Sequence, residues 1–278
     1  MVNQAVPAID FIAEIGINHM GSLELAKKHI LAAKNCGANI AKFQTYITEN
    51  RVSKNAPIYE VLKKSELKFD DFRELKLFCD ENSIEFASTP FCTESADFLA
   101  EIGCKTVKVA SFYLCNPKLL ECLFSESRFS TVLVSTGVSA AADVLAADSL
   151  YNSIHSSHKP QLIFMHCVSQ YPVQKVEDYN LINIPNLAKI TGKTVGYSDH
   201  TIGSFAPALA IALGAKYIEK HFTIDSKLDG ADHAMSADPA TFSEMVQSCN
   251  RVNVALGSIR GESCFDSEIA ISKFRVFE

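Results

Sequence analysis

The sequence predicts one (β/α)8 barrel, a single domain of α/β class that takes up residues 1–278. Short apolar runs rich in β-branched residues alternate with longer amphipathic stretches, which is typical of a parallel sheet covered by helices. Eight such runs occur, the number of strands in this barrel, and the chain length is usual for it. The glycine-rich GxGxxG turn of a doubly wound nucleotide-binding sheet is absent from the sequence.

The strand candidates are short runs such as DFIAEIG and TVLVSTG, with apolar bodies and polar ends. In chain order they cover residues 10–16, 39–45, 85–91, 106–111, 131–137, 162–168, 194–199 and 217–223. The helical patterns between them cover residues 22–37, 70–83, 93–103, 116–125, 205–214 and 238–256.

Capping residues support these boundaries. Plausible helix N-caps are Ser22, Asp70, Thr93 and Asp238. Glycines stand where left-handed C-caps fall before the next strand: Gly37, Gly103, Gly192 and Gly214. The stretch Thr48–Asp70 is predicted to be a long second βα loop, a candidate lid or subunit contact.

Composition excludes several classes of function. The chain is 47% hydrophobic and 21% charged with a net charge of −6, and it has no basic run for nucleic acid. Its apolar stretches are shorter than the roughly 20 residues that span a membrane, and the N-terminus lacks the features of a signal peptide. The nine cysteines are scattered without a CxxC pair, which indicates reduced thiols and neither a disulfide framework nor a zinc site. We therefore expect a cytoplasmic protein without membrane or nucleic-acid partners.

Polar and ionisable side chains follow the apolar body of every predicted strand. In a barrel the C-terminal strand ends meet at one face, where the active site lies, so these side chains predict a polar cavity. They are Glu14, Asn18, Lys42, Gln44, Ser88, Thr89, Lys108, Ser111, Ser135, Thr136, His166, Ser169, Ser198, Asp199, His200, Glu219, Lys220 and His221.

Two lysines in this set, Lys42 and Lys108, predict an anion site because an unpaired buried lysine is costly. Small hydroxyls beside them would complete a cradle for a compact dianion with phosphate and carboxylate groups. The hydroxyl candidates are Thr89, Ser111, Ser135 and Ser198.

Two histidines, His200 and His221, stand at the tips of the last two strands, which are adjacent in the barrel. Two neutral imidazoles can form an open site for a first-row divalent metal, or serve in acid–base or hydrogen-bonding roles, and the spacing does not decide between these. Asp232 and His233 lie in the loop after the last strand and can reach the mouth. The remaining histidine candidates are interpreted as helix-surface residues: His29, His155 and His158.

The motifs EIGINHMGS, AKFQT, STPF, VKVAS, STG, GYSDHT and EKHFT, in this order, resemble the sialic acid synthase family. The resemblance runs from about Phe11 to Glu262. It implies a metal-dependent condensation of phosphoenolpyruvate (PEP) with an open-chain aldose, N-acetylmannosamine or a related sugar. The products implied are a 3-deoxy-2-ulosonic acid and phosphate, and a homodimer is expected.

The resemblance also implies roles for individual residues. His200 and His221 match a divalent metal site, most often for Mn²⁺, with Mg²⁺ or Co²⁺ as alternatives. Glu14, Lys42, Gln44 and Asp232 are the catalytic candidates. PEP binding is assigned to Lys42, Thr89, Lys108, Ser111, Ser135, Ser169 and Ser198, and sugar binding to Asn18, Gln44, Tyr113, Tyr171 and Asp232.

Two departures from the family pattern fall on the acceptor side. Tyr113 stands in the register of a family glutamate that helps to bind the sugar. The chain ends at SKFRVFE, where the linker to the family's C-terminal antifreeze-like domain would begin, so that domain is expected to be absent.

Two alternatives remain open at this stage. One is another PEP aldol synthase, of the 3-deoxy-octulosonate or heptulosonate type, whose phosphorylated acceptor would need further cations. Loose candidates for these cations are Lys54, Lys63, Lys64 and Lys227. The other is a catalytically weakened barrel that binds the sugar or PEP without turnover.

Overall fold

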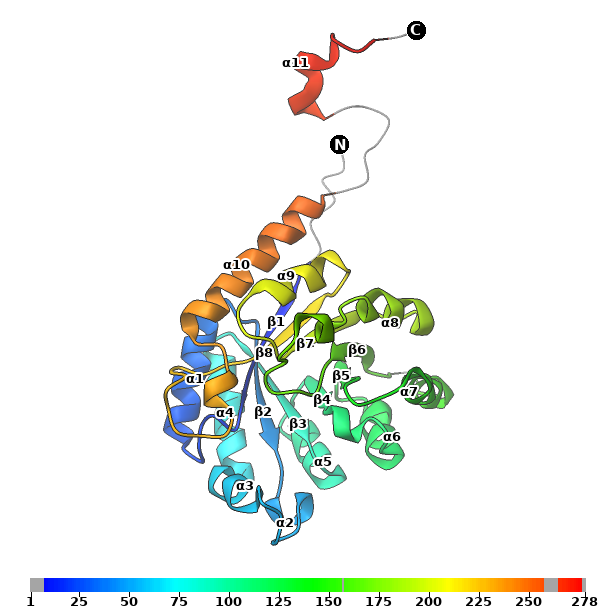
Figure 1. Cartoon of the computed structure of the whole chain (residues 1–278). Helices are drawn as coiled ribbons and strands as arrows, with labels where there is room; N and C mark the ends of the chain where they lie inside the picture. Colours follow the sequence, from blue (N-terminus) through cyan, green and yellow to red (C-terminus); the bar gives the residue numbers. More distant parts are fainter. Residues whose placement is uncertain (1–7, 157, 258–264, 277–278) are drawn as a thin grey trace.

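The computed structural model describes residues 8–156, 158–257 and 265–276. Its eight parallel strands form a closed barrel in chain order, with β1 paired to both β2 and β8, so the predicted fold is confirmed (Figure 1). The strands are β1 (Asp10–Gly16), β2 (Ile40–Thr45), β3 (Glu85–Pro90), β4 (Thr106–Val109), β5 (Thr131–Ser135), β6 (Gln161–Cys167), β7 (Val195–Asp199) and β8 (Tyr217–His221).

Helices cover the outside of the barrel. In chain order, the helices of the described residues are α1 (Leu23–Asn35), α2 (Thr48–Arg51), α3 (Tyr59–Ser65), α4 (Phe69–Glu81), α5 (Thr93–Glu101), α6 (Pro117–Ser125), α7 (Ala141–Ser153), α8 (Asn183–Thr191), α9 (Phe205–Ala212), α10 (Pro239–Leu256) and α11 (Ile269–Ser272). Four 3-10 turns accompany them among the described residues: η1 (Ser111–Tyr113), η2 (Val176–Tyr179), η3 (His233–Met235) and η4 (Asp266–Glu268). In Figure 1, α11 stands away from the barrel.

The caps largely follow the prediction. Ser22 and Asp238 each accept a hydrogen bond from a backbone N–H of the first turn, and the four predicted C-cap glycines all have positive φ. Two N-caps were placed wrongly by one or two residues. Helix α4 begins at Phe69, because Asp71 caps the N–H of Lys68, and α5 already contains Thr93.

The stretch predicted as a long second βα loop contains two short helices, α2 and α3. Helix α3 packs beside the C-terminal end of the barrel through Leu62, in a small apolar cluster with Ile17, Tyr46 and Phe91, and Arg51 of α2 lies over the ring of Phe91. This segment therefore forms part of the wall around the barrel mouth.

The barrel interior is filled by apolar side chains at one level and polar ones above it. The apolar layer consists of Ile12, Ile40, Ala87, Leu133, Ile163 and Met165. Because side chains of a strand alternate between the two faces, the inward position two residues further along is occupied by Glu14 on β1, Lys42 on β2 and Ser135 on β5. The apolar layer thus forms the floor of a polar site.

The same alternation corrects the expectation that every polar strand-end residue converges on the cavity. Asp199 and Lys220 lie on the outer side, where they form a buried ion pair at 2.5 Å. Ser88 is hydrogen-bonded to Thr45 at 2.7 Å, and His166 to the carbonyl of Tyr179 at 2.9 Å. These bonds join β2 to β3, β7 to β8, and β6 to the turn η2, outside the cavity.

Two histidine predictions were also wrong. His29 is fully buried, with its Nδ1 donating to the Leu25 carbonyl, because it shares the inner face of α1 with Ala26 and Ile30. His233 is likewise buried and bonded to Thr223, its ring 6.3 Å from that of His29, so it does not face the mouth.

Eight cysteines are free thiols in the structure, and Cys264 lies outside the described residues, as does Glu262, the end of the family resemblance. Among the described residues, no helix combines the length and the apolar character needed to cross a membrane.

Candidate active site

A cavity of about 400 Å³ opens at the C-terminal end of the barrel. It brings together most of the site residues predicted from the sequence: Glu14, Lys42, Gln44, Thr89, Lys108, Ser111, Tyr113, Ser135, Tyr171, His200, His221 and Asp232. A larger, more open hollow of about 610 Å³ lies beside it, between the end of β6 and helices α7 and α8. Its described lining contains no lysine or arginine, so we place the chemistry in the smaller cavity.

Four buried charges of alternating sign form the base of this cavity. Lys42 is paired with Glu14, and its Nζ lies 3.6 Å from Oε2 of Glu219. Lys108 is paired with Glu219 at 2.8 Å. All four side chains are more than nine-tenths buried, which is tolerable only because each charge has an opposite neighbour.

These neighbours set the protonation of the group. Burial raises the pKa of Glu14, and Lys42 opposes the rise without cancelling it. Burial acts in the same direction on Glu219, but Lys108 and Lys42 outweigh it and lower its pKa, so Glu219 is a carboxylate. Burial would lower the pKa of Lys108, and the charge of Glu219 raises it instead. Glu14 is thus the carboxyl group of this set suited to exchanging a proton.

Small hydroxyls border the lysines on the side of β3 to β6. Lys42 donates to Thr89 Oγ1 at 3.2 Å, and the Gly137 N–H donates to Ser111 Oγ at 3.2 Å. The Oγ atoms of Ser135 and Ser169 are both buried, and neither has a hydrogen-bond partner among the described residues. These groups could donate to an anion.

Gly137 is required at the centre of this group because there is no space for a side chain. A Cβ at this position would lie 2.2 Å from Ser169 Oγ and 2.7 Å from Ser111 Oγ. The STG motif at the end of β5 therefore brings the backbone close to the hydroxyls.

His200 follows β7 and His221 ends the adjacent strand β8, and their ring centroids lie 5.6 Å apart. His200 Nδ1 donates to the Val168 carbonyl at 2.7 Å, which leaves Nε2 with a free lone pair. His221 Nδ1 is buried with no hydrogen-bond partner in the part of the chain that the structure describes. It lies 3.8 Å from an oxygen of Asp232, and burial lowers the pKa of His221 to about 4. Both imidazoles can therefore reach a divalent metal, but burial, which would lower the pKa of His200, is outweighed by Cys167 and the Val168 carbonyl, so a metal competes with a proton at that ring.

This donor set is an open one. Within the described residues, no cluster of three or more His, Cys, Asp or Glu side chains is arranged to hold a metal ion. Two imidazoles would leave coordination positions for water or substrate, as in catalytic sites.

Three predicted site residues do not line the cavity. Asn18 donates to the Phe222 carbonyl at 2.9 Å and to Ser236 at 3.0 Å, so it ties the loop after β1 to the loop after β8. Ser198 donates to Glu219 at 2.8 Å and thereby orients that carboxylate. Ser169 lines the neighbouring hollow, with its Oγ close to Gly137.

The cavity also contains functional candidates that were not predicted. Glu219 was seen only as one polar strand end among many, although it pairs with both lysines. Cys167 follows His166, and its Sγ lies 3.7 Å from His200 Nδ1. Arg51 lies in a segment without a motif and donates to Gln44 Oε1 at 3.1 Å. Gln44 in turn donates to Glu14 at 3.1 Å.

Residues 29–261 match the model of the NeuB family. The chain is 39% identical over 263 residues to the N,N'-diacetyllegionaminic acid synthase of Legionella pneumophila, covering 89% of this chain and 73% of that one. It is 33% identical to the human N-acetylneuraminate-9-phosphate synthase, covering 89% of this chain and 71% of the human one. A solved structure of N-acetylneuraminic acid synthetase from Leptospira borgpetersenii, in complex with citrate, superposes with a TM-score of 0.89 at 34% identity, covering 97% of this chain and 92% of that one.

Proposed function

The chain belongs to the NeuB family, and from this membership and the cavity geometry we propose that it condenses PEP with an open-chain aldose. The products are a 3-deoxy-2-ulosonic acid and inorganic phosphate. The relatives named as synthases of legionaminic acid and of N-acetylneuraminate 9-phosphate support this reaction class. N-acetylmannosamine or a related sugar is the proposed acceptor.

Lys42 and Lys108 are the proposed partners of the PEP phosphate and carboxylate. Their ammonium groups meet at Glu219, and Thr89, Ser111 and Ser135 surround them with hydroxyls. Fixed cations and donors in a water-poor cavity stabilise the charge that develops on the phosphate as it leaves. This convergence of two buried lysines is the observation that carries the proposal.

The proposed chemistry places one acid–base group at the reacting carbons. C3 of PEP attacks the aldehyde carbon, and the positive charge that develops at C2 is quenched by water. The tetrahedral intermediate then loses phosphate by cleavage of its C–O bond. Glu14, whose pKa is raised by burial, takes the proton from the attacking water, and the Gln44 amide holds the carboxylate in place.

His200 and His221 are the proposed ligands of a divalent cation, Mn²⁺ in the first place and Mg²⁺ or Co²⁺ as alternatives. When bound, such a cation supplies a Lewis acid for the aldehyde oxygen. Tyr171 borders both imidazoles, with its ring 4.2 Å from that of His200 and 6.0 Å from that of His221, and Asp232 borders His221, so the two residues would shape the acceptor's surroundings.

Phosphate release from PEP with a panel of aldoses and Mn²⁺ tests the reaction. We expect turnover with at least one aldose, and a loss of roughly a hundredfold or more in His221→Ala. The exposed His155→Ala serves as the matched control and should retain full activity. Unchanged activity in His221→Ala would contradict the metal site, and no turnover with any aldose would favour the catalytically weakened binding barrel.

A reaction of the octulosonate type receives less support. None of the four lysines considered for a phosphorylated acceptor lines the cavity, and Lys63 is held by Glu49 and Glu66. A homodimer and a cytoplasmic location stay predictions, and light scattering of the purified chain tests the first.

A further inference from the structure

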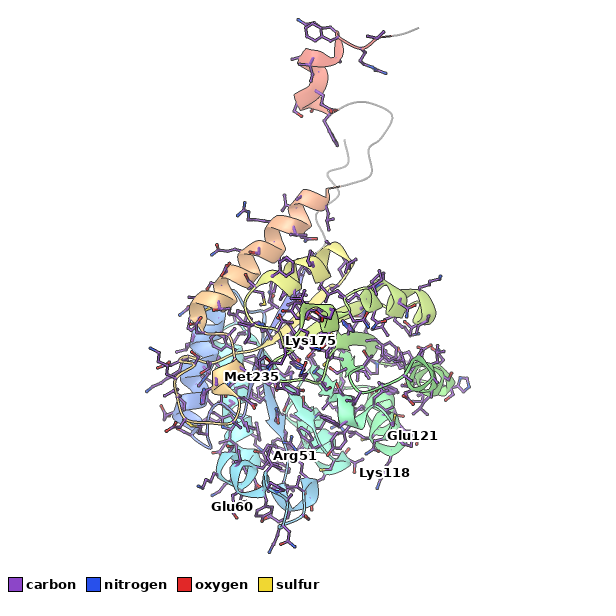
Figure 2. All side chains as sticks on the ribbon, viewed as in Figure 1. Arg51, Glu60, Lys118, Glu121, Lys175 and Met235 are labelled. Carbon is purple, nitrogen blue, oxygen red and sulfur yellow. The ribbon has the colours of Figure 1, made fainter. Side chains whose placement is uncertain are left out.

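Arg51, at the end of α2, lies against an aromatic shelf on the wall of the cavity. Its guanidinium carbon is 3.6 Å from the ring centroid of Phe91 and 4.8 Å from that of Tyr46. Tyr113 meets Phe91 edge-on at 5.4 Å and extends the shelf. Figure 2 shows Arg51 between α2 and the barrel, whereas Glu60 on α3 lies further out. The shelf fixes the plane of the guanidinium and leaves its edge for polar contacts.

Among the described residues, no carboxylate of the cavity wall forms an ion pair with Arg51. Lys42 and Lys108 are both ion-paired, but within the described residues no carboxylate oxygen lies within 4.0 Å of the Arg51 guanidinium. Of its five N–H groups, the structure records one bond, from Nη1 to the neutral amide of Gln44. Partial burial lowers the pKa of Arg51, while Asp232 and Glu14 attract it only from a distance. A partly buried charge of this kind is stabilised by an anion that enters the cavity.

The position of Arg51 along the barrel axis indicates which substrate carries this anion. Gln44, its hydrogen-bond partner, is two residues beyond Lys42 on the same inward face of β2. Arg51 therefore lies nearer the mouth than the lysines proposed to hold PEP. A group that reaches it therefore belongs to the second substrate.

We propose that Arg51 is a specificity-determining residue that pairs with a carboxylate on the acceptor aldose. This inference rests on the proposed function, and among the sugars related to N-acetylmannosamine it selects an aldose that also carries a carboxylate. The planar fork of a guanidinium matches a carboxylate with two parallel hydrogen bonds.

A phosphate ester on the acceptor fits less well. It carries up to two negative charges and needs more than one cation, whereas the further lysines of this region lie outside the cavity lining. Glu14 and Asp232 also line the cavity and would repel a dianion more strongly than a single carboxylate.

The test compares three forms of one aldose, the neutral sugar, its 6-carboxylate and its 6-phosphate, in mannose and in N-acetylmannosamine. Phosphate release with PEP and Mn²⁺ gives kcat/KM for each. We expect the carboxylate to exceed the neutral sugar by roughly tenfold or more, and Arg51→Leu to bring the ratio close to one. Arg51→Lys, which keeps the charge without the fork, should give an intermediate ratio. Because the carboxylate and the neutral sugar are assayed with the same variant, a general loss of folded enzyme lowers both kcat/KM values equally and cancels from their ratio.

The exposed Lys63→Met, in the same segment, is the matched control for loss of one positive charge and should leave the ratio unchanged. A preference for the neutral or phosphorylated sugar, or a carboxylate preference that survives in Arg51→Leu, overturns the inference. So does a variant in which KM rises for PEP and not for the acceptor.

A second measurement separates this inference from the proposed function. Calorimetry with D-mannuronate in the presence of PEP reports binding without turnover. If no aldose reacts, the synthase function fails, and binding that is lost in Arg51→Leu still upholds the carboxylate site. Binding that is absent, or equal in the wild type and the variant, overturns it.

Discussion

Replacing Glu219 by Gln tests whether the buried charges at the cavity base depend on this one carboxylate. Glu219 is 2% exposed and pairs with Lys108 at 2.8 Å and Lys42 at 3.6 Å. The glutamine side chain has the shape of glutamate but no charge. Lys108 is therefore left buried without an ion-pair partner, whereas Lys42 still pairs with Glu14. Breaking a buried pair in this way costs about 3–5 kcal/mol, a large part of a domain's stability of roughly 5–15 kcal/mol.

Urea unfolding at pH 7, in buffer without phosphate, measures this loss. Glu101→Gln is the matched control, because Glu101 pairs with Arg73 at the same 2.8 Å on the surface, with 61% of its side chain exposed. An exposed pair is worth about 0–1 kcal/mol, so the control should lose little. Added phosphate should stabilise Glu219→Gln more than the wild type, because it supplies the missing negative charge to the lysines.

The dependence on pH gives a second readout. The lysines lower the folded-state pKa of Glu219, so its contribution is present above the ordinary carboxyl pKa of 4.5 and is lost as the pH falls below it. The wild type should therefore approach Glu219→Gln in stability as the solution is acidified. A variant within about 1 kcal/mol of the wild type at pH 7 would refute the reasoning, since the lysines would then be stabilised by something other than Glu219.

Two further predictions use other parts of the structure. In Gly137→Ala the new methyl group would displace the hydroxyls of Ser111 and Ser169, so we expect KM for PEP to rise by roughly tenfold or more while the circular dichroism spectrum is unchanged. Burial lowers the pKa of His29 to about 4, below the roughly 6.5 of an unfolded chain, so the unfolded state binds more protons between these values. His29 should therefore cost the wild type about 1.4 kcal/mol of unfolding free energy per pH unit as the pH falls from 6.5 to 4. Urea unfolding measures this loss. The loss should be smaller in His29→Leu and unchanged in the control His155→Leu, whose residue is exposed.

The fold and most of the cavity were predictable because both follow from the period of the strands. An apolar body followed by a polar end placed Glu14, Lys42 and Ser135 on the right strands, and parallel strands bring such ends to one face. The same period also distinguishes inward from outward positions. Applied strictly, it would have excluded Asp199 and Lys220, which are one residue out of phase with Ser198 and Glu219.

His29 is a case in which the sequence contained the signal. Ala26, His29, Ile30 and Ala33 have the spacing of one helix face, and all four are buried. Histidine is polar, so its type suggested the surface, but a neutral imidazole that donates to the Leu25 carbonyl is tolerated in the interior. In this helix the spacing was the better guide than the residue type.

Arg51 and Glu219 mark the limit of prediction from the sequence. The charge of Glu219 acquires its role only when the barrel closes, which places β8 one strand away from β2 and opposite β4, relations between distant strands that no local pattern contains. Arg51 depends on how residues 46–68 fold over the mouth, and this segment has neither a strand nor a helix long enough to show a period.

The two residues also belong to parts of the site that can change independently. The charges that we assign to PEP come from the strands, where a displaced side chain would disturb the closed sheet and the apolar layer below it. The acceptor side is built from Arg51 and Phe91 on connecting segments and from Asp232 in the loop after β8. A substitution there alters the charge and shape offered to the second substrate without moving a strand. If the acceptor binds as we propose, a substitution of Arg51 within residues 46–68 changes the charge offered to it without disturbing the strands that hold Lys42 and Lys108.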